Sequence, residues 1–110
     1  MKTQLTHDEK IQFYDDGYFV VKGAVAPDLV EAALTRMKSA RKGEFLGPDQ
    51  AMTDLVNASS VTPIMHELMG PFDPPVTCQT GILKKTEPGE HFNNLGYRDK
   101  DMPYYGAQVH

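Results

Sequence analysis

The spacing of apolar residues predicts an amphipathic helix near the start of the chain. Residues 6–9 read Thr-His-Asp-Glu, a capping box in which the threonine hydroxyl covers free amides and the glutamate reaches back. Ile11, Tyr14 and Tyr18 follow at spacings of three and four, which is the pattern of an apolar stripe on a helix. Gly17 supplies a stop signal, because glycine readily takes the left-handed conformation that ends many helices.

Two further helices are predicted before residue 71. The second has Pro27 in its first turn and ends at Gly43, since proline suits the start of a helix and glycine its end. The third is short, covers residues 64–69, opens at Thr62-Pro63 and closes at Gly70. One face of the second helix is predicted to carry Val30, Ala33, Leu34, Met37 and Arg41.

Strands are predicted from aromatic and β-branched runs. Residues 18–21, Tyr-Phe-Val-Val, form one such run, and Lys22-Gly23 turns the chain after it. Pro74-Pro75 forces an extended approach to a second strand at residues 76–85. A third short strand is predicted to end at His110. Residues 44–60 show little periodicity apart from a turn at residues 47–49, so no helix is predicted there.

Composition narrows the functional classes. The chain has 110 residues, at most one modest domain, and a net charge of −4, which argues against nucleic acid because phosphate binding needs a basic face. Cys78 is the only cysteine, which excludes an internal disulfide and is compatible with a reducing compartment. No apolar run reaches membrane-span length and the start lacks the apolar core of a signal peptide. A cytoplasmic protein without membrane or nucleic-acid partners is expected.

Three segments carry a resemblance to a known family. Residues 13–21 read FYDDGYFVV, residues 62–70 read TPIMHELMG, and residues 79–85 read QTGILKK, followed by Pro88-Gly89. In this order and spacing they resemble the N-terminal part of the phytanoyl-CoA dioxygenase family, and the resemblance covers about residues 5–110.

The resemblance implies an α+β fold in which N-terminal helices precede the first strands of a double-stranded β-helix of the jelly-roll, cupin-like kind. Residues 1–110 would then be the truncated N-terminal part of a single dioxygenase domain. Its helical region would cover about residues 5–70 and the start of the β-helix about residues 76–110. The family uses Fe(II), 2-oxoglutarate and O₂ to hydroxylate a small-molecule or acyl-linked substrate.

The resemblance also implies site residues. In the family a His-x-Asp pair and a distant histidine hold the metal, because two imidazoles and a carboxylate leave one face of iron open. His110 is the expected first ligand, with the aspartate's position lying beyond the chain. His91 is its rival, with Asn93 where the aspartate belongs. Gln79 either faces the pocket, where it contacts substrate or 2-oxoglutarate, or lies on the outer face of its strand.

Two functional classes therefore stay open at the level of sequence. In one, the chain is a fragment of an Fe(II)- and 2-oxoglutarate-dependent dioxygenase that has no turnover by itself, because it carries one of the three expected metal ligands. In the other, it is a non-catalytic module that binds a small molecule or a partner.

Overall fold

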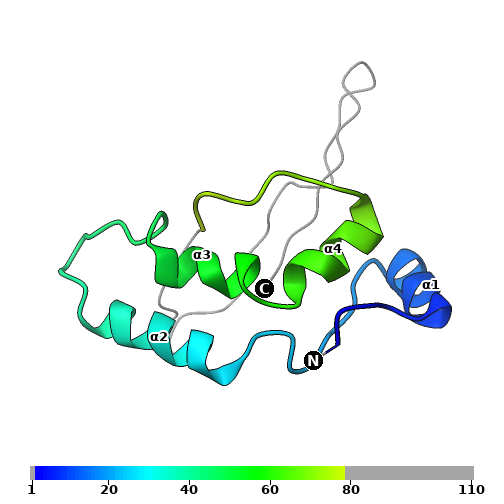
Figure 1. The fold of residues 1–110 in the computed structure, drawn as a ribbon, viewed down its shortest axis with the longest axis horizontal. Coiled ribbons are helices and arrows are strands. Elements are labelled where there is room, and N and C mark those ends of the chain that lie inside the picture. Colours follow the sequence, from blue (N-terminus) through cyan, green and yellow to red (C-terminus); the bar gives the residue numbers. More distant parts are fainter. Residues whose placement is uncertain (1, 79–110) are drawn as a thin grey trace, which may run out of the picture. The chain divides into compact units, whose positions relative to one another are not determined.

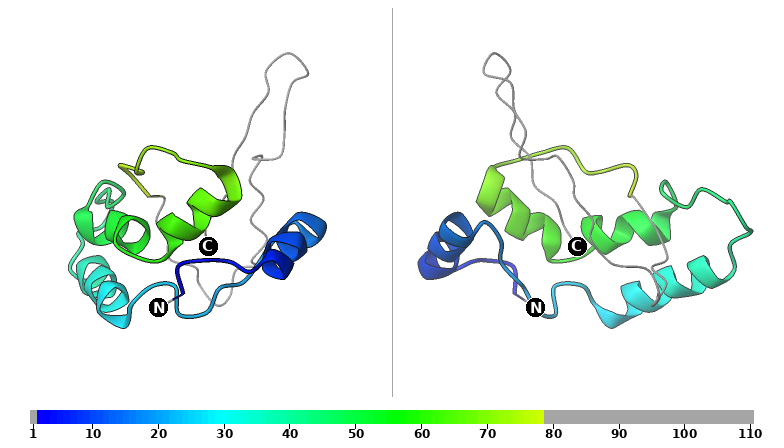
Figure 2. Two further views of the ribbon diagram at one scale, coloured as in Figure 1. Left: turned by 45° about the vertical axis from the view of Figure 1, so that its right-hand side comes forward. Right: turned by 180° about the vertical axis from the view of Figure 1, so that it is seen from behind.

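The computed structural model describes residues 2–78, which belong to one compact unit covering residues 1–80. Helix α2 packs against α3, and α3 packs against α4, whereas α1 has fewer neighbours (Figures 1 and 2). The helices, in chain order, are α1 (His7–Asp16), α2 (Pro27–Lys38), α3 (Gln50–Asn57) and α4 (Val61–Met69).

The expected α+β fold is wrong, because residues 2–78 form four helices joined by irregular segments and contain no strand. Residues 18–21 form no regular element and make no backbone hydrogen bond to another segment of the described unit. The run has the right residue types, but a strand also needs a neighbour to bond its amides and carbonyls. The described part of the second predicted strand, residues 76–78, is not a strand either, and its remainder lies outside the described residues.

Both ends of α1 are as predicted. The Thr6 hydroxyl accepts a hydrogen bond from the Glu9 amide at 3.2 Å, and the Glu9 carboxylate accepts one from the Thr6 amide at 3.5 Å. Gly17 has a φ of 80°, and its amide donates to the Phe13 carbonyl at 2.8 Å. The capping box and the glycine stop are therefore confirmed.

The predicted apolar stripe of α1 is not buried. Ile11, Tyr14 and Tyr18 are 44%, 65% and 66% exposed, and α1 has no buried residue. Polar contacts hold this part of the chain to α4 instead. The Tyr14 hydroxyl donates to the Leu68 carbonyl at 3.1 Å, and the amide of Leu5, just before α1, donates to the Glu67 carboxylate at 2.7 Å.

Helix α2 begins at Pro27, as predicted, but the predicted end at Gly43 is wrong. The helix ends at Lys38, and Gly43 lies in a separate turn with a φ of 81°. Next to the helix end, the Ser39 hydroxyl donates to the Arg36 carbonyl at 3.0 Å. Serine favours helix ends because its hydroxyl competes for backbone groups in this way.

Helix α3 was not predicted. It follows the predicted turn, which the structure has at Gly47 and Pro48, and it places Met52 at the centre of the core with 1% exposure. The core cluster joins Met52 to Ala33 of α2 and to Leu46 of the connecting loop. The partly buried residues packed against this cluster are Met37, Ala40, Ala51, Leu55 and Cys78.

Helix α4 confirms the third predicted helix, although it begins earlier, at Val61. Its end is as predicted, because Gly70 has a φ of 82° and its amide donates to the His66 carbonyl at 2.9 Å. Val61 and Ile64 are its buried residues. In the part of the chain that the structure describes, no helix is both long and apolar enough to span a membrane.

Candidate functional site

The predicted site residues Gln79, His91 and His110 all lie outside the described residues. Among residues 2–78, no group of three or more histidine, cysteine, aspartate or glutamate side chains is placed to hold a metal ion. His66 is exposed at the last turn of α4, where its ring meets Phe72 edge-on with centroids 4.5 Å apart.

The structure does show how the chain approaches the first predicted site residue. Cys78 directly precedes Gln79, and its amide donates to the Gly47 carbonyl at 2.9 Å. Its thiol lies 3.5 Å from the Met52 carbonyl, to which it donates. Three residues earlier, the Pro75 carbonyl accepts from the Asn57 side-chain amide at 2.9 Å. Residues 75–78 are thus attached to α3 and to the loop before it.

Gly47 permits the closest of these approaches. A Cβ atom at this position would lie 2.6 Å from the Thr77 hydroxyl oxygen and 2.7 Å from the Cys78 carbonyl oxygen. Side chains do not approach other atoms so closely. The contact between Gly47 and residues 77–78 therefore requires a residue without a side chain.

The loop that carries Gly47 is held by an ionic cluster around Arg36. The Arg36 guanidinium donates to Glu44 at 2.7 Å and also to Asp49, the residue that precedes α3. The Glu44 carboxylate accepts a second bond from the Arg41 amide at 2.9 Å. Hydrogen bonds from Arg36, with a further contribution from the Arg41 amide, lower the pKa of Glu44. The two carboxylates in turn raise the pKa of Arg36.

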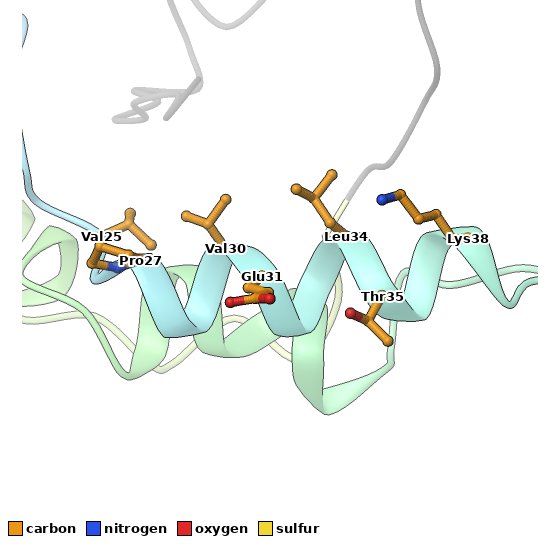
Figure 3. Close-up of a pocket in the computed structure, with 7 residues that line it drawn as sticks. All are labelled: Val25, Pro27, Val30, Glu31, Leu34, Thr35 and Lys38. Atoms are coloured by element: carbon orange, nitrogen blue, oxygen red, sulfur yellow. The ribbon is translucent and has the colours of Figure 1, made fainter.

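An open hollow of about 610 Å³ lies along α2 (Figure 3). Val30 and Leu34 are 42% and 48% exposed there, so only part of the predicted apolar face of α2 packs inward, through Ala33 and Met37. The described lining of this hollow comes from α2 and from Val25, two residues before it, and contains no cluster of convergent polar groups. The lining residues are Val25, Pro27, Val30, Glu31, Leu34, Thr35 and Lys38.

Sequence reasoning missed Gly47 and Arg36. Gly47 has a turn signal beside it, Pro48, but its partners Thr77 and Cys78 lie far along the chain. Arg36 pairs with carboxylates eight and thirteen residues away, beyond the three- and four-residue spacings that identify ion pairs on one helix. The only signal in the sequence is the concentration of basic residues at the end of α2 with acidic residues in the following loop.

The comparisons with family models, with curated proteins and with solved structures found no match to this chain.

Proposed function

We propose that this chain is part of an Fe(II)- and 2-oxoglutarate-dependent dioxygenase that hydroxylates a small-molecule or acyl-linked substrate. The observation that carries the proposal is the order and spacing of three segments, residues 13–21, 62–70 and 79–85, which resemble the phytanoyl-CoA dioxygenase family. The proposed protein is cytoplasmic, in keeping with its single cysteine.

Two features of the helical unit support this proposal. The segment at residues 62–70 coincides with α4 and its glycine end, so the matched residues make a defined element. The segment at residues 79–85 begins directly after Cys78, which is attached to the loop before α3.

The proposed roles follow the chemistry of the group. His110 is the proposed Fe(II) ligand, with His91 as its rival, and Gln79 is proposed to contact 2-oxoglutarate or substrate. The bound Fe(II) would supply the oxygen chemistry of the group, in which O₂ and 2-oxoglutarate are consumed, CO₂ is released, and one oxygen atom enters the substrate while the other enters succinate.

A second candidate is a non-catalytic module that binds a small molecule or a partner protein. The half-exposed Val30 and Leu34 on α2 favour it, since neighbouring exposed apolar side chains are typical of binding surfaces. This candidate requires neither metal nor 2-oxoglutarate.

The test is succinate release from 2-oxoglutarate by the purified protein, at the full length that its gene encodes, with and without added Fe(II). The variants are His110→Ala and His91→Ala, compared with His66→Ala as a control on the exposed histidine of α4. We expect Fe(II)-dependent succinate release that is abolished by His110→Ala and retained in the other two variants.

Each result has a defined meaning. Loss of activity in His91→Ala, with His110→Ala still active, would transfer the ligand role to His91. Absence of Fe(II)-dependent succinate release from the wild-type protein would overturn the dioxygenase and leave the binding module.

A further inference from the structure

We propose that two copies of this chain associate through the outer face of α2, with the two α2 helices antiparallel. This pairing face consists of Val30, Glu31, Leu34 and Lys38. Its basis is an apolar row bordered by two opposite charges, which together are complementary to a second copy of the same face. The inference does not depend on the proposed function, since it uses only residues of the helical unit.

The first step is the apolar row. Val30 and Leu34 are four residues apart, so they lie on the same side of α2, and they are 42% and 48% exposed (Figure 3). The helix packs against the core through Ala33 and Met37, which belong to a different side. Covering neighbouring half-exposed apolar side chains removes their surface from water, which favours association with a partner.

The second step is the pair of charges beside this row. Glu31 and Lys38 are both exposed and line the same hollow as Val30 and Leu34. Within residues 2–78, neither of them forms an ion pair. They are seven residues apart, which is about two helical turns, so they lie on one side of α2 about 10 Å apart along its axis. The helix dipole favours acidic residues near the start and basic residues near the end, but it does not require both to border an apolar row.

The third step is the geometry of the pair. A two-fold axis between positions 34 and 35 places Glu31 of each copy opposite Lys38 of the other, because both positions lie equally far from the axis. Such an interface is isologous, so each contact forms twice. The two copies of Leu34 then lie next to the axis. Parallel helices would instead set each charge against its own kind, and like charges repel. The charge pattern therefore selects a second copy in the antiparallel orientation.

The same pattern argues against a membrane surface as the occupant. Helices that lie on membranes carry lysine and arginine beside their apolar face, where these residues meet anionic lipids. Here Glu31 borders the apolar row, and the chain has a net charge of −4.

The size of the contact predicts a weak dimer. Each copy contributes one face of a helix of 12 residues, whereas stable interfaces bury about 1,600 Å² in total. We therefore expect a dissociation constant on the order of 100 µM, so that the monomer predominates at about 10 µM. Thermal unfolding at such dilution reports on the monomer.

The experiment is sedimentation equilibrium of the protein at its encoded length, from about 10 µM to about 500 µM, because a weak dimer forms by mass action. Its variants are Glu31→Lys and Lys38→Glu, on exposed residues. By symmetry each substitution turns two attractive pairs into two repulsive ones. We expect either variant to raise the dissociation constant at least about fivefold.

Two controls make the same changes in net charge away from α2. Asp15→Lys matches Glu31→Lys, and Lys22→Glu matches Lys38→Glu, both on exposed residues. We expect each control to keep the dissociation constant within about twofold of the wild-type value, because charges outside a contact are screened by salt.

Two further samples test the pairing itself. The double variant Glu31→Lys with Lys38→Glu exchanges the charges, so the antiparallel pairs form again and we expect the wild-type dissociation constant. A mixture of the two single variants combines one copy that is positive at both positions with another that is negative at both. We expect this mixed dimer to be at least as tight as the wild-type dimer. The mixture gives the same answer if the double variant does not fold.

The outcomes are distinct. A wild-type protein that is still monomeric at the highest concentration would overturn the inference and leave the face to a different occupant. A wild-type dimer that Glu31→Lys does not weaken, or that Asp15→Lys weakens equally, would also overturn it. Single variants that fail to associate when mixed would contradict the antiparallel pairing. None of these results bears on the dioxygenase, which succinate release tests separately.

Discussion

Arg36 donates to two carboxylates of the loop between α2 and α3, and Glu44 accepts a backbone amide as well. The side chains of Arg36, Glu44 and Asp49 remain about 30% exposed. Water therefore screens their pairing, and each ion pair by itself contributes little to the stability of the fold. Their effect is geometric, because a planar guanidinium with several donors can hold two separate points of one loop at once. Gly47 lies between those two points, which connects this surface cluster to the backbone contact at Cys78.

The lowered pKa of Glu44 leads to a prediction for acid stability. A carboxyl group whose pKa is lower in the folded than in the unfolded protein stabilises the fold above its ordinary pKa and loses that contribution as pH falls through the folded value. We therefore expect Glu44→Gln to lower the thermal midpoint at pH 7, and the difference from wild type to shrink below the ordinary value of 4.5. The difference in thermal midpoint is measured by thermal unfolding, followed by circular dichroism, at a series of pH values from 7 to 3.

Glu31→Gln is the matched control, since it makes the same chemical change on an exposed residue of α2. A difference between Glu44→Gln and wild type that stays constant with pH, or that equals the effect of Glu31→Gln, would contradict the role given to Glu44.

The stability of α1 depends on its capped ends and on polar contacts more than the stability of the other helices does. None of its residues is buried, whereas α2, α3 and α4 each bury at least one. A helix of this length is marginal in water without packing. The capping box, the Gly17 end and the Tyr14 hydroxyl bond therefore account for much of its order.

For α1 we predict that Thr6→Ala weakens the helix locally. The substitution removes the hydroxyl that covers the Glu9 amide, a loss of about 1 kcal/mol in capped helices. Because α1 buries nothing, we expect faster amide hydrogen exchange at residues 7–16 with little change at α3. Thr3→Ala, in the exposed segment before the helix, is the control. Equal loss of protection in α1 and α3 would show that α1 unfolds only with the rest of the unit.

At the scale of the whole described unit, the core is small and centred on α3. Met52 is the most deeply buried large side chain, and the residues around it come from α2, from the loop and from Cys78. Several large apolar side chains stay in contact with water, including Val20 at 67% and Val76 at 82% exposure. Stability should therefore be unevenly distributed and concentrated where α2 and α3 meet.

The corresponding prediction is that Met52→Ala lowers the free energy of unfolding by about 2–5 kcal/mol, the range for truncating a buried side chain of this size. Val20→Ala, on an exposed residue, should change it by less than about 0.5 kcal/mol. Urea titration followed by circular dichroism measures both. Similar values for the two variants would mean that Met52 is not the centre of the core.

The predictions that succeeded depend on neighbours within a few residues. The capping box at Thr6, the start of α2 at Pro27 and the glycine ends at Gly17 and Gly70 are all set by backbone hydrogen bonds over three or four positions. Such local hydrogen bonds form without contacts to distant parts of the chain. The roles that the resemblance gives to Gln79, His91 and His110 stay predictions, because these residues lie outside the described part of the chain.

The predictions that failed needed partners distant in sequence. Residues 18–21 have the composition of a strand but no neighbouring strand among the described residues. Asp49, which precedes α3, makes no capping bond to the helix and pairs with Arg36. Apolar periodicity identified a stripe on α1 and one on α2, but not which side chains would be covered.

The sequence by itself determined where α1 and α2 begin and where α1 and α4 end, because local hydrogen bonds and the conformational preferences of proline, threonine and glycine act without tertiary contacts. Only the tertiary structure decided that Met52 lies at the centre of the core, that Arg36 holds the loop between α2 and α3, and that the backbone of Cys78 lies in close contact with Gly47. Burial and close backbone contact depend on how segments meet in space. The packing of residues that are far apart in the sequence determines how those segments meet.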